Sequence, residues 1–329
     1  MREVFPLKPH DSVKGDQKDK VLDEFPKFKI VKQEIINTID SHTEGLDLKR
    51  VEEFMRSYEL PIRDYVIFDE DSLDEKKVFE IFEKFGYKYD KEAYLGNWLA
   101  MCDTNLDLIL IKRRENFEKF NGGRVTESVL VHELAHGTSG FSSCIVTSTG
   151  DILAPRTGFA VGDSSETTKG AFLEEGFVDM LAGKYNKQYM EPELRDKMLP
   201  IFRHKYNDYQ LTRTRSDLVD NIEVVLPFPT HYAIFTSEYG FSSLVSAQAA
   251  FGLELLCDKE PKLFETMLKA RNDVEYLRKI PQLINKISPG LYSELRKLKY
   301  TESGFSQGLY TIIEKVYGGK IGDIEIRKF

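Results

Sequence analysis

The sequence contains few cysteines and few histidines, and both shortages narrow the chemistry available to the chain. Three cysteines occur in 329 residues, and they stand at Cys102, Cys144 and Cys257. An odd number without CxxC spacing excludes a disulfide framework and a cysteine-based zinc site, and it fits a reducing compartment. Six histidines are present, and two of them lie four positions apart, at His132 and His136.

A basic excess, a long apolar run and an apolar leader are also missing. Lys and Arg number 46 against 54 for Asp and Glu, so the net charge is -8 and nucleic acid is not expected as a partner. A membrane span needs about 18 apolar residues in a row, and no such run occurs. The first 20 residues contain no apolar core followed by a cleavage site. We therefore expect a cytoplasmic protein that does not partner a membrane.

Hydrophobic residues make up 41% of the chain, which is enough for a buried core. Apolar residues at helical spacing predict helices over residues 28–58, 78–85, 125–136 and 168–184, the last with an N-cap at Thr167 or Thr168. Short apolar runs predict strands at 65–68, 94–101 and 106–111, and a hairpin made of 144–149 and 152–161. Residues after Pro192 are predicted to be mainly helical.

This pattern predicts an α+β fold in three parts. Residues 1–60 would form a helical N-terminal region. Residues 61–190 would form the catalytic subdomain, with a small mixed sheet and an active-site helix. Residues 191–329 would form a mainly α-helical C-terminal subdomain.

The motif that indicates chemistry is His132-Glu133-Leu134-Ala135-His136, an HExxH sequence. Residues i and i+4 of a helix share one face, so both imidazoles can bind one ion, and imidazole is a good ligand for Zn²⁺. Glu133 lies beside the first ligand, where it can act as general base on a metal-bound water. Apolar residues before the motif and inside it, with no proline to interrupt them, support a helix.

A catalytic zinc site needs a third protein ligand and an open position for water. The metzincin pattern would place a histidine at position 142, but Ser142 stands there, and Ser139 replaces its glycine. The remaining histidines lie in no ligand-like context; they are His10, His42, His204 and His231. A carboxylate is therefore favoured as the third ligand.

The segment Phe172-Leu-Glu-Glu-Gly-Phe177 is similar to the WLNEGF segment of the gluzincins, the zinc peptidases related to thermolysin and leucine aminopeptidase. The resemblance covers residues 126–185 and implies a zincin-like core. It implies that Glu175 is the third ligand. It also implies that Asp179, four residues later, accepts the free ring N–H of a ligand histidine, with His132 the expected donor.

Other carboxylates stay open as ligands at this point. Glu174 is the rival to Glu175, although we expect Glu174 to be a solvated helix residue. Asp151, Asp163 and Glu166 are also able to bind a metal, but no motif surrounds them.

Gluzincins usually have a Tyr or His that donates a hydrogen bond to the oxyanion, and the resemblance places it after Glu175. The candidates are His231, Tyr232 and Tyr239. A peptide substrate would pair with an edge strand, for which residues 152–161 are the candidate because Pro155 favours an edge position.

These observations predict a metallopeptidase with one Zn²⁺ per chain that hydrolyses a peptide or protein substrate. One alternative is a zincin-fold metal-binding or regulatory protein without peptidase activity. Another is a toxin-like protease that acts on a host protein.

Overall fold

The computed structural model describes residues 26–69, 73–87, 89, 100–103, 106–113, 124–138, 145–146, 152–153, 156–161, 168–189, 242–271 and 273–318. This part of the chain is mixed α+β and mostly helical, with a three-stranded sheet, which confirms the predicted class at that level. The chain forms two compact units, one of residues 1–163 with 268–275 and one of 164–267 with 276–329. The three predicted sequence domains stay a prediction.

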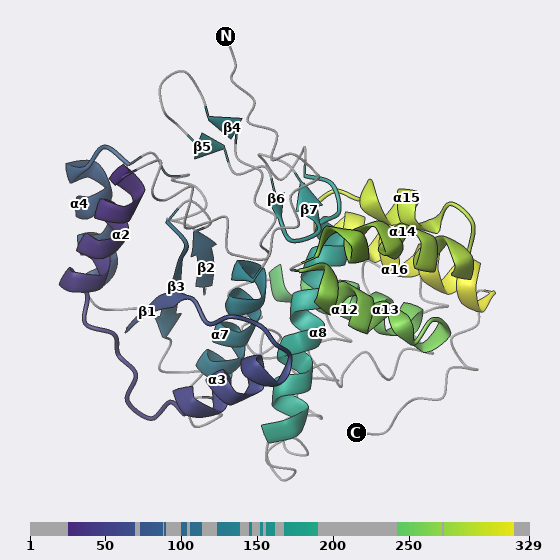
Figure 1. Cartoon of the computed structure of the whole chain (residues 1–329), viewed down its shortest axis with the longest axis horizontal. Coiled ribbons are helices and arrows are strands. Elements are labelled where there is room, and N and C mark those ends of the chain that lie inside the picture. The colour runs from purple at the N-terminus through teal and green to yellow at the C-terminus, as the bar shows by residue number, and fades with distance from the viewer. Residues whose placement is uncertain are drawn as a thin grey trace. The chain divides into compact units, whose positions relative to one another are not determined.

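The first unit contains the sheet and the helices around it (Figure 1). Its helices are α2 (Pro26–Thr38), α3 (Leu48–Ser57), α4 (Asp74–Lys84) and α7 (Arg124–Gly137). Its main strands are β1 (Asp64–Asp69), β2 (Ala100–Asp103) and β3 (Leu108–Arg113), in the order β1-β3-β2. β3 runs parallel to β1 and antiparallel to β2.

Both faces of this sheet are buried, because helices cover each of them. Val66 and Phe68 of β1 and Leu108 and Leu110 of β3 share one core cluster with residues of α2 and α4. The alternate residues point to the opposite face and are also buried; they are Ile67, Ile109 and Ile111. Helix α7 contacts β2 and β3, so it covers that second face. The sheet thus supports the helix that carries the HExxH motif.

The helical pattern predicted over residues 28–58 consists of two helices, because the chain turns at Gly45 (φ +77°) before Asp47 caps α3. One predicted boundary in this unit is wrong. The turn expected at 102–105 begins later, since Cys102 and Asp103 still pair with β3. The Asp103 carboxylate accepts the backbone N–H of Leu106 at 3.0 Å, which places the turn after the strand.

The predicted hairpin is present, but its second strand is shorter than expected. β4 (Ile145–Val146) pairs antiparallel with β5 (Ile152–Leu153). Residues 152–161 do not form one edge strand, because β6 (Arg156–Thr157) turns back and pairs with β7 (Ala160–Val161). Gly158, with φ +56°, occupies the first position of that two-residue turn, as tight hairpins require.

The second unit is helical in its described part. Its helices are α8 (Ala171–Tyr189), α12 (Ser242–Lys259), α13 (Lys262–Ala270), α14 (Val274–Ile287), α15 (Leu291–Arg296) and α16 (Glu302–Tyr317), with the end of α13 and the start of α14 assigned to the first unit. α12 packs against both α8 and α16. α8 starts at Ala171, three residues after Thr168, so neither Thr167 nor Thr168 is its cap.

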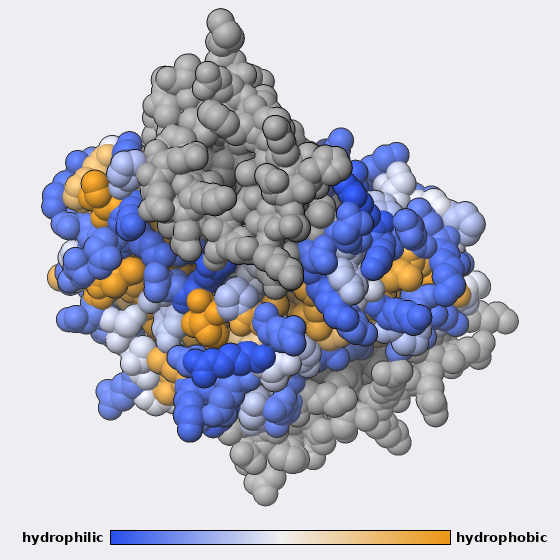
Figure 2. All heavy atoms as spheres, in the orientation of Figure 1, coloured by the Kyte–Doolittle hydropathy of each residue, from blue (hydrophilic) through white to orange (hydrophobic). Residues whose placement is uncertain are grey.

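Large hydrophobic side chains are mostly buried in the described residues. Ile30, Leu73 and Tyr300 are the exposed ones. Figure 2 shows hydrophilic residues over most of the coloured surface on the face in view. Within the described ranges, no helix has the length and apolar character needed to cross a membrane.

Candidate metal centre

Helix α7 presents the two histidines of the motif on one side. Leu130, Val131, Leu134 and Ala135 are all buried, which fixes the helix against the sheet and leaves the histidines half-buried. The Nε2 atoms of His132 and His136 lie 3.2 Å apart. At this distance, either one imidazole nitrogen donates a hydrogen bond to the other, or both nitrogens face one cation.

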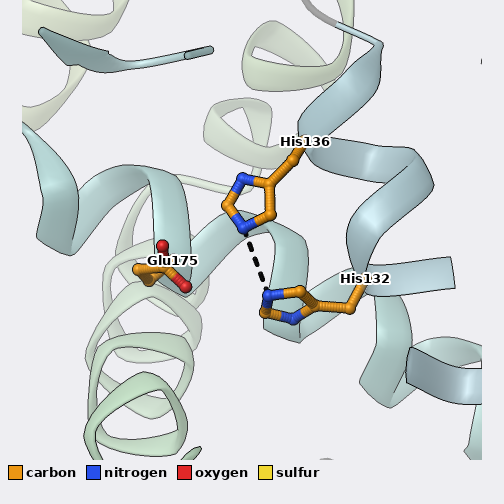
Figure 3. Close-up of side chains that lie close together, drawn as sticks. All are labelled: His132, His136 and Glu175. Atoms are coloured by element: carbon orange, nitrogen blue, oxygen red, sulfur yellow. Dashed lines mark hydrogen bonds between the residues drawn. The ribbon is translucent and has the colours of Figure 1, made fainter. Parts of the chain in front are cut away.

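Glu175 of α8 completes a group of three ligand atoms. One atom each from His132, His136 and Glu175 lies within 4.8 Å of the other two, and the carboxylate of Glu175 points toward the imidazoles (Figure 3). The HExxH motif and the gluzincin resemblance together predict the same three residues as ligands. Glu174, the rival carboxylate, is not part of this group.

The donor set fits Zn²⁺. Two nitrogens bound to one tetrahedral ion at about 2.05 Å lie about 3.3 Å from each other, close to the separation of the two Nε2 atoms. Two imidazoles with one carboxylate also match the ligand set of catalytic zinc sites, which keep a fourth position open for water.

Glu133 stands between the two histidines in the sequence and is 8% exposed. Its place on α7 beside His132 is the one expected of a general base in HExxH enzymes. Its catalytic role stays a prediction.

Helix α8 buries three carboxylates close together. Glu174 is 1% exposed, Glu175 is 8% exposed and Asp179 is 2% exposed. The expectation that Glu174 is solvated is therefore wrong, because α8 is buried on every side over residues 171–183. Asp179 lies one turn after Glu175 on the same face, as its predicted role requires, and that role stays a prediction.

Several predicted residues lie outside the described part of the chain. These are the oxyanion candidates His231, Tyr232 and Tyr239, and the alternative metal ligands Asp151, Asp163 and Glu166.

Two residues that the sequence does not indicate, Ser246 and Arg271, make contacts at the site. Ser246 of α12 donates a hydrogen bond to Glu175 Oε2 at 3.3 Å. Arg271, which follows α13, donates to the carbonyl oxygen of Ala135 and to Thr138 Oγ1, the latter at 3.1 Å. No motif surrounds either residue, and each contact joins segments far apart in the sequence, so the sequence carries no signal for them.

Charged residues hold both ends of α7. At its start, Glu127 is 2% exposed, accepts the backbone N–H of Asp47 at 2.8 Å and lies 3.7 Å from Arg50. At its end, Arg63 Nε donates to the carbonyl oxygen of Gly137 at 3.2 Å, near the buried Arg271. An acidic group at the first turn and basic groups at the last both favour the helix dipole.

Cys257 does not compete as a nucleophile or a ligand at neutral pH. Burial raises the pKa of its thiol to about 12, with a smaller contribution from the nearby Glu254. The thiolate, which is the reactive and metal-binding form, is therefore scarce at pH 7.

Comparisons with protein-family models, with curated protein sequences and with solved structures find no match. Any functional conclusion therefore rests on the residues of the chain and on their geometry.

Proposed function

We propose that the chain is a zinc-dependent metallopeptidase of the gluzincin type, built on a zincin-like core. The observation that carries this proposal is the grouping of His132, His136 and Glu175, whose ligand atoms lie within 4.8 Å of one another. An HExxH helix combined with a buried carboxylate from a second helix is the ligand arrangement of that class of hydrolase.

The three ligands would hold one Zn²⁺ per chain. A zinc ion held there would supply a Lewis acid and an activated water. The carboxylate of Glu133 would take a proton from the attacking water and pass it to the nitrogen of the leaving amine. A Lewis acid combined with the general base Glu133 suits the hydrolysis of a peptide bond.

The remaining roles extend the same proposal. Asp179 orients a ligand histidine through its ring N–H, and Tyr239 or His231 donates a hydrogen bond to the developing oxyanion. The substrate is a peptide or protein in the cytoplasm. The two alternatives predict different outcomes, since a regulatory metal-binding protein binds zinc without hydrolysis, and a toxin-like protease cleaves a host protein in preference to general peptides.

The test is the variant Glu133→Gln, which keeps the size of the side chain and removes its basicity. We expect zinc content to stay at one per chain and hydrolysis of a peptide library to fall about 10²- to 10⁴-fold, the usual effect of losing a general base. Zinc content is measured by atomic emission and cleavage by mass spectrometry. The control is Glu53→Gln on α3, whose side chain is 58% exposed.

Hydrolysis that survives Glu133→Gln would contradict the mechanism. A wild-type chain that binds zinc and cleaves no peptide of the library would favour the metal-binding alternative.

A further inference from the structure

Glu175 is held by a residue from another helix. The hydroxyl of Ser246 donates a hydrogen bond to Glu175 Oε2 at 3.3 Å. Both side chains are buried, with Ser246 6% exposed and Glu175 8% exposed. A hydrogen bond between buried groups restricts the rotation of the carboxylate far more than water at the surface would.

The packing of α8 on α12 fixes Ser246 at that distance. Gly176 follows Glu175 directly, and a Cβ atom at Gly176 would lie 2.7 Å from the carbonyl oxygen of Ala249 on α12. The two helices therefore approach closely enough that only glycine fits at this point. Ala249 lies three residues after Ser246, so both face α8. The close approach at Gly176 thus brings the Ser246 hydroxyl within reach of Glu175.

We propose that Ser246 is a positioning residue of the metal centre. Its hydrogen bond to Glu175 Oε2 restrains the orientation in which the Glu175 carboxylate is presented to the ion. The inference rests on the proposed function, because it assigns Glu175 as the third zinc ligand.

A fixed carboxylate binds zinc more tightly than a mobile one. A free Glu side chain loses rotamer freedom when it coordinates an ion, and a partner that already restricts it removes part of that cost. Loss of such a partner typically weakens metal affinity 10- to 100-fold. We expect an effect in this range for Ser246.

The first experiment compares the full-length wild type with Ser246→Ala. Zinc affinity is measured by competition with a chromophoric chelator, and we expect it to fall at least about tenfold. The cobalt-substituted proteins give a second readout, since the visible absorption of Co²⁺ reports its ligand geometry and should differ between the two. The control is Ser288→Ala, a half-buried serine after α14, for which neither readout should change.

A second pair of variants separates the hydroxyl from packing. Ser246→Thr and Ser246→Val have nearly the same shape and differ in the hydroxyl. We expect the threonine variant to bind zinc at least about tenfold more tightly than the valine variant. Any disturbance of folding is shared by both, so the comparison holds even if Ser246→Ala is unstable.

The outcomes distinguish the two proposals. Equal zinc affinity of the threonine and valine variants, with a zinc-binding wild type, would overturn the role of Ser246 and leave the metallopeptidase proposal intact. A wild type that binds no zinc would overturn both.

Discussion

Four carboxylates at or beside the candidate centre are buried, although a buried carboxylate is costly unless a partner compensates it. Glu133, Glu174, Glu175 and Asp179 are each less than 9% exposed. Moving one charge out of water costs several kcal/mol, so a chain that buries four of them must provide hydrogen bonds, positive charge or a cation. A divalent ion between His132 and Glu175 would supply that charge. In the proposed function, the ion is one of the partners that compensate this burial.

The adjacent pair Glu174 and Glu175 allows a sharp test at the level of single residues. Only Glu175 belongs to the ligand group, so Glu175→Ala should weaken zinc binding more than about 100-fold, beyond the loss caused by removing an outer partner. Glu174→Ala should weaken it less than about tenfold. The chelator competition assay measures both.

The two variants control for each other, because they make the same change at neighbouring buried positions of one helix. The reverse order of effects would move the third ligand to Glu174.

At the scale of elements, α7 must be held in place for its histidines to converge. His136 lies in the last turn of α7, where helices fray most easily unless their terminal carbonyl groups are bonded. Arg271 and Arg63 supply those bonds through the carbonyl oxygens of Ala135 and Gly137. The guanidinium of Arg271 also lies over the ring of Phe159, at 5.2 Å from its centroid. The end of α7 is thus anchored by two charged donors.

Arg271→Met should therefore destabilise the protein. The change leaves the Ala135 carbonyl and the Thr138 hydroxyl without a charged donor in a buried place, which costs about 2–3 kcal/mol in the free energy of unfolding. Urea denaturation followed by circular dichroism measures it. Arg56→Met is the control, since Arg56 is 69% exposed. Equal stability of the two variants would show that Arg271 does not hold α7.

At the scale of the whole molecule, the parts predicted well are those fixed by local sequence. The HExxH helix and the helix after Gly170 follow from apolar spacing and motif, and strand β1 follows from a short apolar run. The prediction of one strand over 152–161 was wrong because the chain turns back at Gly158, and hydrophobic periodicity does not reveal such a turn.

The parts that the sequence does not reveal depend on tertiary contacts. Glu174 looks like a surface residue, and its burial follows from the helices around α8. Ser246 lies 71 positions from Glu175, and Arg271 lies 136 positions from Ala135. No spacing rule joins residues so distant. The three residues of the proposed centre were thus predictable from motifs, and the residues that contact them or their helix were not.

Zinc should stabilise the whole chain if the site is formed only in the folded state. A ligand at 100 times its Kd adds about 2.7 kcal/mol to the free energy of unfolding. For a chain of 329 residues this corresponds to a rise in Tm of about 4 °C. Differential scanning calorimetry of metal-free protein, with and without added zinc, measures the shift, and a chelator should reverse it.

Two controls show whether the shift comes from this centre. The double variant His132→Ala, His136→Ala removes both imidazoles and should show no rise in Tm with zinc. Magnesium should give no rise with the wild type, because it prefers oxygen ligands in an octahedral site. A zinc-dependent rise that persists in the double variant would place the stabilising ion elsewhere in the chain, and the grouping of the two histidines with Glu175 would then no longer support a metallopeptidase.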